Sequence, residues 1–419
     1  MHADYSAVFV PGGFPVHTYN PRSEQKLEER VRESERNLCK LVIVTGHTKS
    51  GKTVLTQRVL PRNISIWVDG GAVKTEDDFW QIVIEALDVT QTVQISDQTE
   101  RTLSAGSKGG AQMDLFVFKG GGEINAGIAQ KSGKTISRAR AVSARVAALQ
   151  AMRERKTPLV IDDFHYLPKE IQGSVVRALK QLIFEGLPVV IIAIPHRRYD
   201  AIKVEREMTG RIHPVQIRSW ADDELRFISN TGFPLLGTYL MPIPQQLLAE
   251  NAMGSPHLMQ EFCREICRSK RFREKKDGED LFLDNNELED IFREVAESIG
   301  RPIFEKLARG PRQRSDRMQR ELKQGKKVDI YELVLHALAF LKPGLVSLEY
   351  ENLRAAIKEV SVQGIPQMQE VVRVLKHMAK IAATDQSSTP VIDFEESEKK
   401  LHITDPFFAF YLRWGKIGA

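Results

Sequence analysis

The sequence predicts a protein of the α/β class, in which a three-layer domain with a parallel sheet is followed by helical segments. Three observations indicate this fold. Short apolar runs alternate with helical patterns in the first half of the chain. After Trp220 the pattern becomes helical, and the last ninety or so residues combine amphipathic helices with one alternating segment. Alternation of strands and helices is typical of a parallel sheet covered on both faces.

The composition is that of an ordinary globular protein without a membrane segment. The chain has 419 residues, enough for two or three domains, with 42% hydrophobic and 27% charged residues. Its three cysteines are too few for a disulfide framework, which favours a reducing, cytoplasmic location. Cys263 and Cys267 have no partner at zinc spacing, so we expect them to be buried small side chains. The longest apolar stretch, 187–195, is too short to span a membrane.

The first domain, residues 1–217, is expected to hold buried strands with helices between them. Near-continuous apolar runs are typical of strands that are covered on both faces. The expected strands are 41–45, 64–68, 159–163 and 189–194. The expected helices are 52–59, 76–88, a long helix rich in Ala and Arg at 137–155, and 168–185.

Residues 92–135 interrupt this alternation, because they are polar and rich in glycine. Within them, AQMDLFVFKGGGEINAGIAQ alternates like a two-stranded hairpin that turns at Lys119–Gly122. Two interpretations stay open. The segment is either an exposed decoration of the core or a loop that contacts a neighbouring subunit or another partner.

A small helical lid is expected over 218–275, and a basic linker with one helix at 286–298 is expected over 276–327. The lid helices are ADDELRFISNTGF, PQQLLAENA and PHLMQEFCREICRS. The last part of the linker, 301–327, holds ten Lys and Arg residues against three Asp and Glu. Charge runs of this kind either lie on solvated surface or bind nucleic acid.

Residues 328–419 predict a C-terminal winged-helix domain. Three amphipathic helices, DIYELVLHALAFL, EYENLRAAIKEV and IPQMQEVVRVLKHMAKIAA, precede the hairpin PVIDFEESEKKLHITD, which is winged-helix order. The third helix lies within 365–384 and carries Arg373, Lys376, His377 and Lys380. With 301–327, this helix makes DNA a candidate partner through phosphate contacts, and the alternative is a domain that serves only for packing.

The strongest functional signal is GHTKSGKT, which follows the apolar run LVIVT and opens a helix. Its spacing is that of a phosphate-binding loop, where glycines let the backbone wrap a phosphate chain and N–H groups supply positive potential. Lys52 is expected to bridge the β- and γ-phosphates of ATP, and Thr53 to hold Mg²⁺. The expected nucleotide-binding residues are Gly46, His47, Thr48, Lys49, Ser50, Gly51, Lys52 and Thr53, with Pro256 from the lid.

The second half of such a site is expected in TPLVIDDFHYLP, residues 157–168. Apolar residues place Asp162 at the end of a strand, where ligands bind in open α/β sheets. Asp162 is expected to hold Mg²⁺, and Asp163 to orient and deprotonate the attacking water. Paired carboxylates also cap helices, so a cap for 168–185 is the alternative, but the phosphate-binding loop favours the nucleotide site.

Three arginines are candidates for contact with the γ-phosphate. Arg197 and Arg198 follow the strand at 189–194, and Arg211 precedes the next strand. A guanidinium at the edge of the sheet would sense the γ-phosphate in its own subunit or across an interface. The alternative is a solvated basic loop.

With these motifs, the chain resembles P-loop ATPases of the AAA+ and STAND classes. The resemblance rests on GHTKSGKT, LVIDDFH, the strand-terminal arginines, GR before the next strand, W-x-x-x-E-L from Trp220 to Leu225, and G-S-P. The order of parts is similar to that of origin-recognition-type and archaeal STAND ATPases. DDFH also resembles the Walker B motif of transposition AAA+ proteins, and ITDPFFAFYLRW is similar to the end of STAND-like ATPases. VHTYNPRSEQKLEERV resembles the segment that packs near adenine, with Tyr19 and Arg22 as candidates.

The resemblance implies a three-layer P-loop ATPase core with ATP and Mg²⁺ as cofactors, and a homo-oligomer that changes with nucleotide state. Two departures favour a slow switch over a fast motor. Asp162-Asp163 stands where AAA+ proteins usually carry Asp-Glu, and PHRR stands where many have a polar sensor residue.

Three functional hypotheses follow. The first is a slowly hydrolysing ATPase switch that regulates an effector protein, with antiviral defence or mobile-element biology as the expected setting. The second is a DNA-binding initiator or transposition regulator in which ATP licenses assembly. The third is a nucleotide-binding scaffold without turnover.

Overall fold

A five-stranded parallel sheet forms the centre of the first domain. The computed structural model describes residues 4–36, 38–88, 92–97, 136–141, 143–194, 210–270, 280–311, 317–383 and 390–417. The strand order is β2–β5–β6–β1–β7, and every neighbouring pair is parallel. The strands are β1 (Leu41–Thr45), β2 (Ile66–Asp69), β5 (Leu159–Asp162), β6 (Val189–Ala193) and β7 (Ile212–Gln216). Thr45 aligns with Ala193 and with Gln216, so the strands end at one shared edge.

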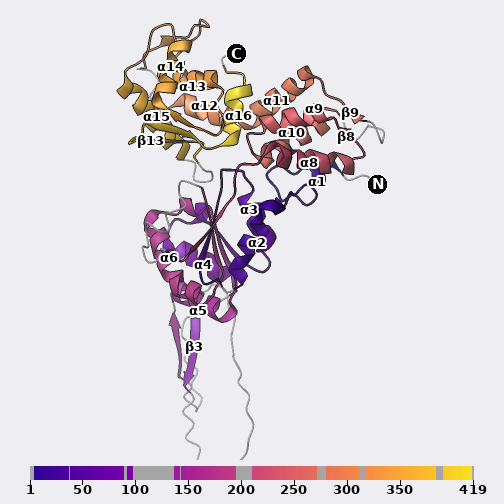
Figure 1. The fold of residues 1–419 in the computed structure, drawn as a ribbon. Coiled ribbons are helices and arrows are strands. Elements are labelled where there is room, and N and C mark those ends of the chain that lie inside the picture. Colours follow the sequence, from indigo (N-terminus) through magenta and orange to yellow (C-terminus); the bar gives the residue numbers. More distant parts are fainter. Residues whose placement is uncertain are drawn as a thin grey trace, which may run out of the picture.

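Helices cover both faces of this sheet (Figure 1). One face packs against α4 (Glu76–Ala86), α5 (Ala144–Arg155) and α6 (Lys169–Phe184), and the other against α2 (Leu27–Arg32) and α3 (Lys52–Val59). Alternate residues of β1 serve the two faces: Leu41 and Ile43 join the first cluster, whereas Val42 and Val44 join the second. The predicted three-layer α/β core is confirmed.

Short 3₁₀ turns lie beside these elements: η1 (Ser23–Gln25), η2 (Glu33–Glu35), η3 (Gly70–Ala72) and η4 (Phe164–Tyr166).

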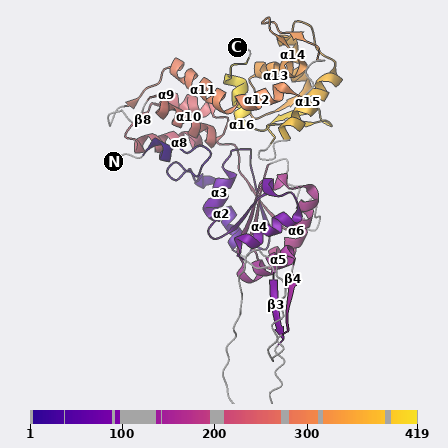
Figure 2. The ribbon, with the colours of Figure 1, turned by 180° about the vertical axis from the view of Figure 1, so that it is seen from behind.

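The prediction of a long helix at 137–155 is wrong for its first residues. Residues Ile136–Ala141 instead form strand β4, which pairs antiparallel with β3 (Thr92–Asp97). The helix begins at Ala144 because the Ser143 side chain accepts a hydrogen bond from the Val146 N–H and caps it there. The β3–β4 ribbon projects from the end of the core that is remote from the other units (Figures 1 and 2). The hairpin turn expected at Lys119–Gly122 lies outside the described residues.

Four helices pack around one apolar cluster, which joins the lid expected over 218–275 to the helix expected in the linker, and we call this whole unit the lid. The helices are α8 (Asp222–Leu235), α9 (Pro242–Asn251), α10 (Pro256–Ser269) and α11 (Asn285–Ile299), with the short paired strands β8 (Tyr239–Leu240) and β9 (Asp280–Leu281). Cys263 and Cys267 are fully buried in this cluster, as expected. Val8 and Phe9, at the end of α1 (Tyr5–Val8), also pack there, so the start of the chain lies against the lid.

The C-terminal unit contains helices and a three-stranded antiparallel sheet. Its helices are α12 (Arg301–Arg309), α13 (Ile330–Leu341), α14 (Tyr350–Val360) and α15 (Met368–Ala383). Its sheet has the order β12 (Ser347–Glu349), β14 (Lys400–Ile403), β13 (Ile392–Glu395), and β10 (Arg320–Glu321) pairs with β11 (Lys327–Val328). Three helices and a hairpin follow each other in the expected order, and the assignment of this unit as a winged helix stays a prediction. Leu307 and Ala308, from the expected linker, pack in the apolar cluster of this unit.

Helix α16 (Pro406–Trp414) joins the lid to the C-terminal unit. Phe407, Phe410 and Tyr411 belong to the lid cluster, whereas Phe408 and Leu412 belong to the C-terminal cluster. Neighbouring residues of α16 therefore pack into two different apolar clusters, that of the lid and that of the C-terminal unit. Within the described part of the chain, none of the helices combines the length and apolar character that crossing a membrane requires.

Candidate nucleotide site

The predicted phosphate-binding loop connects β1 to α3 at the edge of the sheet where the strands end. Gly51 has a φ of 91°, which glycine adopts without strain. A Cβ on Gly46 would lie 2.7 Å from Ser50 Oγ and 3.1 Å from the Ile217 carbonyl oxygen, so a side chain there would crowd the loop. Helix α3 has no side-chain cap at its N-terminus. Its first N–H groups are therefore suited to receive an anion.

Lys52 and Thr53, at the end of the phosphate-binding loop, lie close to the end of strand β5. Thr53 Oγ1 donates a hydrogen bond of 3.0 Å to Asp162 Oδ2. The Lys52 ammonium donates to the carbonyl oxygens of Gly46 at 2.9 Å and His47 at 2.8 Å. Burial lowers the pKa of Lys52 to about 8, although Asp163 and Asp162 act in the opposite direction. The side chains predicted to bind phosphate and Mg²⁺ thus lie together.

Asp163 adopts an unusual backbone conformation beside this pair. Its φ is 49°, in the left-handed region, and its N–H donates to Asp162 Oδ1 at 2.9 Å. Burial and the Asp162 carboxylate raise the pKa of Asp163 to about 6. Burial also raises the pKa of Asp162. The N-cap residue of α6 is Pro168, which provides no side-chain cap, so the alternative that this acidic pair caps the helix finds no support.

Gly70 makes the position of Asp163 possible. A Cβ on Gly70 would lie 2.4 Å from the Asp163 carbonyl oxygen and 3.2 Å from that of Asp162. These neighbours are backbone atoms that cannot rotate away. No motif in the sequence marks Gly70, because the contact joins the end of β2 to the end of β5.

A cavity of about 480 Å³ opens over the loop. It is lined by the N-terminal segment, the phosphate-binding loop, Asp163, the start of α10 with Pro256 and His257, and the C-terminal unit at Asp405. Its volume is within the range of small-ligand pockets, roughly 300–1,000 Å³. The side chains of Tyr19 and Arg22, expected near the base, also line it.

The residues present fit a magnesium nucleotide. Thr48 and Ser50 line the cavity, and their hydroxyl oxygens are buried without a hydrogen-bond partner among the described residues. Such groups call for an acceptor or donor from a ligand, because an unpaired buried hydroxyl costs about 1–3 kcal/mol. A hydroxyl and a carboxylate, as in Thr53 and Asp162, are the hard oxygen ligands that Mg²⁺ prefers.

The C-terminal unit contacts the phosphate-binding loop directly. Lys49, whose φ is 60°, directs its ammonium to Asp405 Oδ2 at 3.5 Å and to the Phe407 ring at 3.4 Å from the centroid. Asp405 also caps α16, since its Oδ1 accepts from the N–H groups of Phe407 and Phe408. From the lid, Ser255 Oγ donates to the Lys49 carbonyl at 3.4 Å.

Arg211, the candidate arginine that lies among the described residues, is not brought to this site. Arg197 and Arg198 lie outside the described residues. Arg211 lies at the opposite edge of the sheet, because its carbonyl accepts from the N–H of Leu41, the first residue of β1. Its guanidinium lies 5.2 Å from the centroid of the Phe184 ring. Contact with the nucleotide of its own chain is therefore a wrong prediction for Arg211, because a parallel strand separates its two ends by about 3.3 Å per residue.

Many of the basic residues considered for DNA binding have acidic partners within the chain. Arg317 pairs with Asp329, Arg320 with Glu370, Lys323 with Glu359, and Lys376 with Glu396. His377 shares a hydrogen bond of 2.8 Å with the Tyr331 hydroxyl. Arg373 and Lys380 lie on the exposed side of α15.

Comparison with solved structures supports the fold. A Walker-type ATPase of Pyrococcus abyssi is 14% identical, with a TM-score of 0.51, and the match covers 95% of this chain and 99% of that one. Cdc6p from Pyrobaculum aerophilum is 11% identical, with a TM-score of 0.45 and coverage of 98% and 97%. The Aeropyrum pernix Orc1 protein, solved in complex with DNA, is 12% identical, with a TM-score of 0.45 and coverage of 98% and 96%. No protein-family model and no curated protein sequence matches the chain.

The strand order, the place of the phosphate-binding loop and the likeness to the Pyrococcus abyssi protein define one class of fold. The chain has a three-layer α/β fold with a phosphate-binding loop, as predicted, and its likeness to the Walker-type ATPase of Pyrococcus abyssi extends over nearly its whole length.

Proposed function

We propose that this chain binds Mg-ATP in the cavity and hydrolyses it slowly to ADP and phosphate. One observation carries the proposal: Lys52, Thr53 and Asp163 line the cavity, and Thr53 Oγ1 donates a hydrogen bond of 3.0 Å to Asp162 Oδ2 beside it. Such an arrangement fits a triphosphate with its metal ion.

Each residue has a distinct part in the proposed reaction. The N–H groups at the start of α3 and the Lys52 ammonium bind the phosphate oxygens. Thr53 and Asp162 would hold Mg²⁺, which neutralises charge on the phosphates when bound. Asp163 would orient the attacking water and accept its proton while the water oxygen bonds to the γ-phosphorus. The bond between the γ-phosphorus and the bridging oxygen breaks, and ADP leaves with the electron pair.

Slow turnover is consistent with the geometry of Asp163. Its carboxylate is one methylene shorter than that of the glutamate usual in AAA+ proteins, so it reaches less far into the cavity. Its backbone is held in the left-handed region, and the Gly70 contact leaves it no room to shift. A base that reaches its water poorly loses part of the roughly 10²- to 10⁴-fold that general base catalysis contributes.

Isothermal titration calorimetry with Mg-ATP tests the binding step. We expect saturable heat from the wild-type protein and a loss of at least about 100-fold in affinity for Lys52→Ala, because the buried ammonium contacts the phosphates. Lys358→Ala, an exposed lysine on α14, is the matched control and should bind like wild type. Equal heats from the Lys52 and Lys358 variants would contradict the proposal.

Phosphate release tests the hydrolysis step separately. Asp163→Asn should bind Mg-ATP but release phosphate at least about 100-fold more slowly than wild type. Release at the same rate would remove Asp163 from the role of base. Binding without any release from the wild-type protein would favour the scaffold hypothesis.

The nucleotide would act as a switch, because the lid and the C-terminal unit both reach the phosphate-binding loop through Lys49. A homo-oligomer and a regulated effector protein are the partners that the resemblance implies. Light scattering after size exclusion, with ADP and with a non-hydrolysable ATP analogue, tests assembly. The same molar mass in both states would argue against nucleotide-driven oligomers.

A further inference from the structure

Trp220 contacts the phosphate-binding loop, although it lies outside the sequence motif of that loop. Its indole Nε1 donates a hydrogen bond of 3.0 Å to the carbonyl oxygen of Ser50. In a planar trans peptide the C=O and the following N–H point in opposite directions. A donor that holds the Ser50 carbonyl therefore also fixes the direction of the Gly51 N–H, which points away from the indole.

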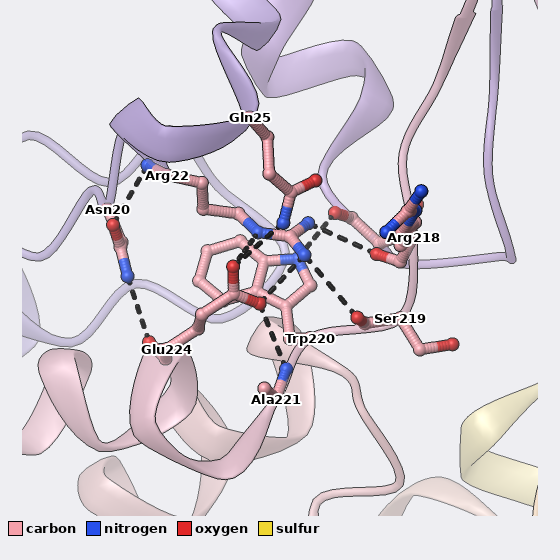
Figure 3. Close-up of polar contacts among 9 residues, drawn as sticks. Asn20, Arg22, Gln25, Arg218, Ser219, Trp220, Ala221 and Glu224 are labelled. Atoms are coloured by element: carbon pink, nitrogen blue, oxygen red, sulfur yellow. Dashed lines mark hydrogen bonds and ion pairs between the residues drawn. The ribbon is translucent and has the colours of Figure 1, made fainter.

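A buried ion pair holds the indole in place (Figure 3). The Arg22 guanidinium lies 4.8 Å from the centroid of the Trp220 ring and makes a two-pronged contact with Glu224, at 2.8 Å and 2.7 Å. It also donates to the carbonyls of Arg218 and Ser219, the two residues before Trp220. The Arg22 side chain is only 2% exposed.

Both carboxylate oxygens of Glu224 also accept hydrogen bonds from several groups. Besides Arg22, its carboxylate accepts from Gln25 Nε2 and from the N–H of Ala221, both at 2.9 Å. Asn20 accepts from the Arg22 N–H and donates to the Glu224 carbonyl, which ties the N-terminal segment to α8 (Figure 3). Arg22 keeps a left-handed φ of 49° within this cluster. Strain of this kind is retained where surrounding contacts determine the conformation, often at functional sites.

A buried ion pair is weak evidence for stability, since desolvation offsets much of the attraction, but it fixes geometry. This pair fixes the position of an aromatic ring between the N-terminal segment, the lid and the loop. Trp220 is further held by its own N–H, which donates to the Gly254 carbonyl at 3.2 Å. Trp220 and Arg22 both line the cavity.

We propose that Trp220 is a positioning residue of the nucleotide site: through the Ser50 carbonyl it orients the Gly51 N–H toward the phosphates, and the Arg22–Glu224 pair sets the place of the indole. This inference rests on the proposed function, because it assumes that phosphates occupy the loop.

Trp220→Phe tests the inference, because it keeps an aromatic ring under Arg22 and removes the N–H donor, while the accompanying loss of ring volume is matched in the control. The chain provides a matched control in Trp67, whose Nε1 also donates to a backbone carbonyl, that of Leu60 at 3.1 Å, and whose ring also lies under an arginine. By calorimetry we expect Trp220→Phe to bind Mg-ATP about three- to tenfold more weakly, since one hydrogen bond is worth about 0.5–1.5 kcal/mol. Trp67→Phe should change the affinity less than twofold.

Two further readouts distinguish positioning from general stability. The KM for ATP should rise in Trp220→Phe while kcat changes little, whereas a merely structural defect lowers the active fraction and therefore kcat. The nucleotide-induced change in tryptophan fluorescence should disappear in Trp220→Phe and persist in Trp67→Phe, because only Trp220 lines the cavity among the four tryptophans.

Arg22→Lys tests the part of the ion pair. It also tests the inference if the Trp220→Phe protein does not fold. Lysine cannot make the two-pronged contact, so binding should weaken in the same direction, and the double variant should bind no worse than Trp220→Phe alone. Normal affinity in Arg22→Lys would overturn the part assigned to the ion pair.

The outcomes separate this inference from the proposed function. If wild type binds Mg-ATP and Trp220→Phe binds as tightly as Trp67→Phe, the inference is overturned and the proposed function stands. If wild type binds no magnesium nucleotide, both are overturned.

Discussion

Single residues of the site owe their positions to contacts with backbone atoms rather than to their own preferences. Asp163 holds a left-handed φ of 49°, which costs an ordinary residue about 1–3 kcal/mol. Gly70 faces its carbonyl so closely that no side chain fits between them. The placement of the proposed base is therefore decided by a residue in another strand connection.

We expect Gly70→Ala to lower ATP turnover more than ATP binding. The added methyl must displace the backbone of Asp163, whereas Lys52 and Thr53 stay on the loop. A shift of about 1 Å in a positioned group reduces rates by about 100-fold. Phosphate release and calorimetry on the same preparation measure the two effects.

Gly344→Ala is the control, because nothing lies within 4 Å of the Cβ that it adds. Unchanged turnover in Gly70→Ala would show that the position of the Asp163 backbone does not limit the reaction.

At the scale of elements, α16 depends on tight packing against the turn between α11 and α12. A Cβ on Gly300 would lie 2.3 Å from Tyr411 Cβ and 3.1 Å from the Phe407 carbonyl oxygen. The backbone of Gly300 has a φ of −100°, which alanine also adopts, so any effect of a substitution there is steric.

Gly300→Ala should reduce the free energy of unfolding by about 1–3 kcal/mol, the usual cost of overpacking a core. The reason is that α16 must move away from α11 and loses part of its contact with the lid cluster. Denaturant titration measures the effect, with Gly344→Ala again as control. A denaturation midpoint equal to that of the wild-type protein would mean that α16 shifts without loss of stability.

At the scale of the whole molecule, the nucleotide cavity is closed by a residue from near the end of the chain. Lys49 and Asp405 are separated by 356 residues, and both line the cavity. The Asp405 carboxylate is a negative charge in a cavity proposed to receive polyphosphate. Like charges held close in a poorly solvated site repel each other.

Asp405→Asn should strengthen Mg-ATP binding by about two- to tenfold, with a smaller gain for Mg-ADP, because removing one negative charge matters more for the more highly charged ligand. Asparagine is as good an N-cap as aspartate, so α16 keeps its start. Calorimetry with both nucleotides measures the difference, and Asp280→Asn, at an exposed position of β9, is the control. Weaker binding of both nucleotides would show that the ion pair with Lys49 supports the site instead.

The features that could be predicted from the sequence are local ones. The bounds of β1 and α3 match the prediction, and Thr53 meets Asp162, because a contiguous motif and a buried strand specify them. The helix expected from 137 was too long, since its Ala and Arg pattern gave no sign of the Ser143 cap. Contacts such as Gly70 with Asp163, or Lys49 with Asp405, depend on tertiary packing that no spacing along the chain reveals.

The two-sided packing of α16 has a consequence for motion. Pulling the lid away from the C-terminal unit would expose aromatic side chains on both, including Phe410 and Phe408. The described contacts of these two units with the loop are instead hydrogen bonds, one ion pair and one cation–π contact. We therefore expect the lid and the C-terminal unit to keep their mutual packing around α16 when a ligand binds to the loop.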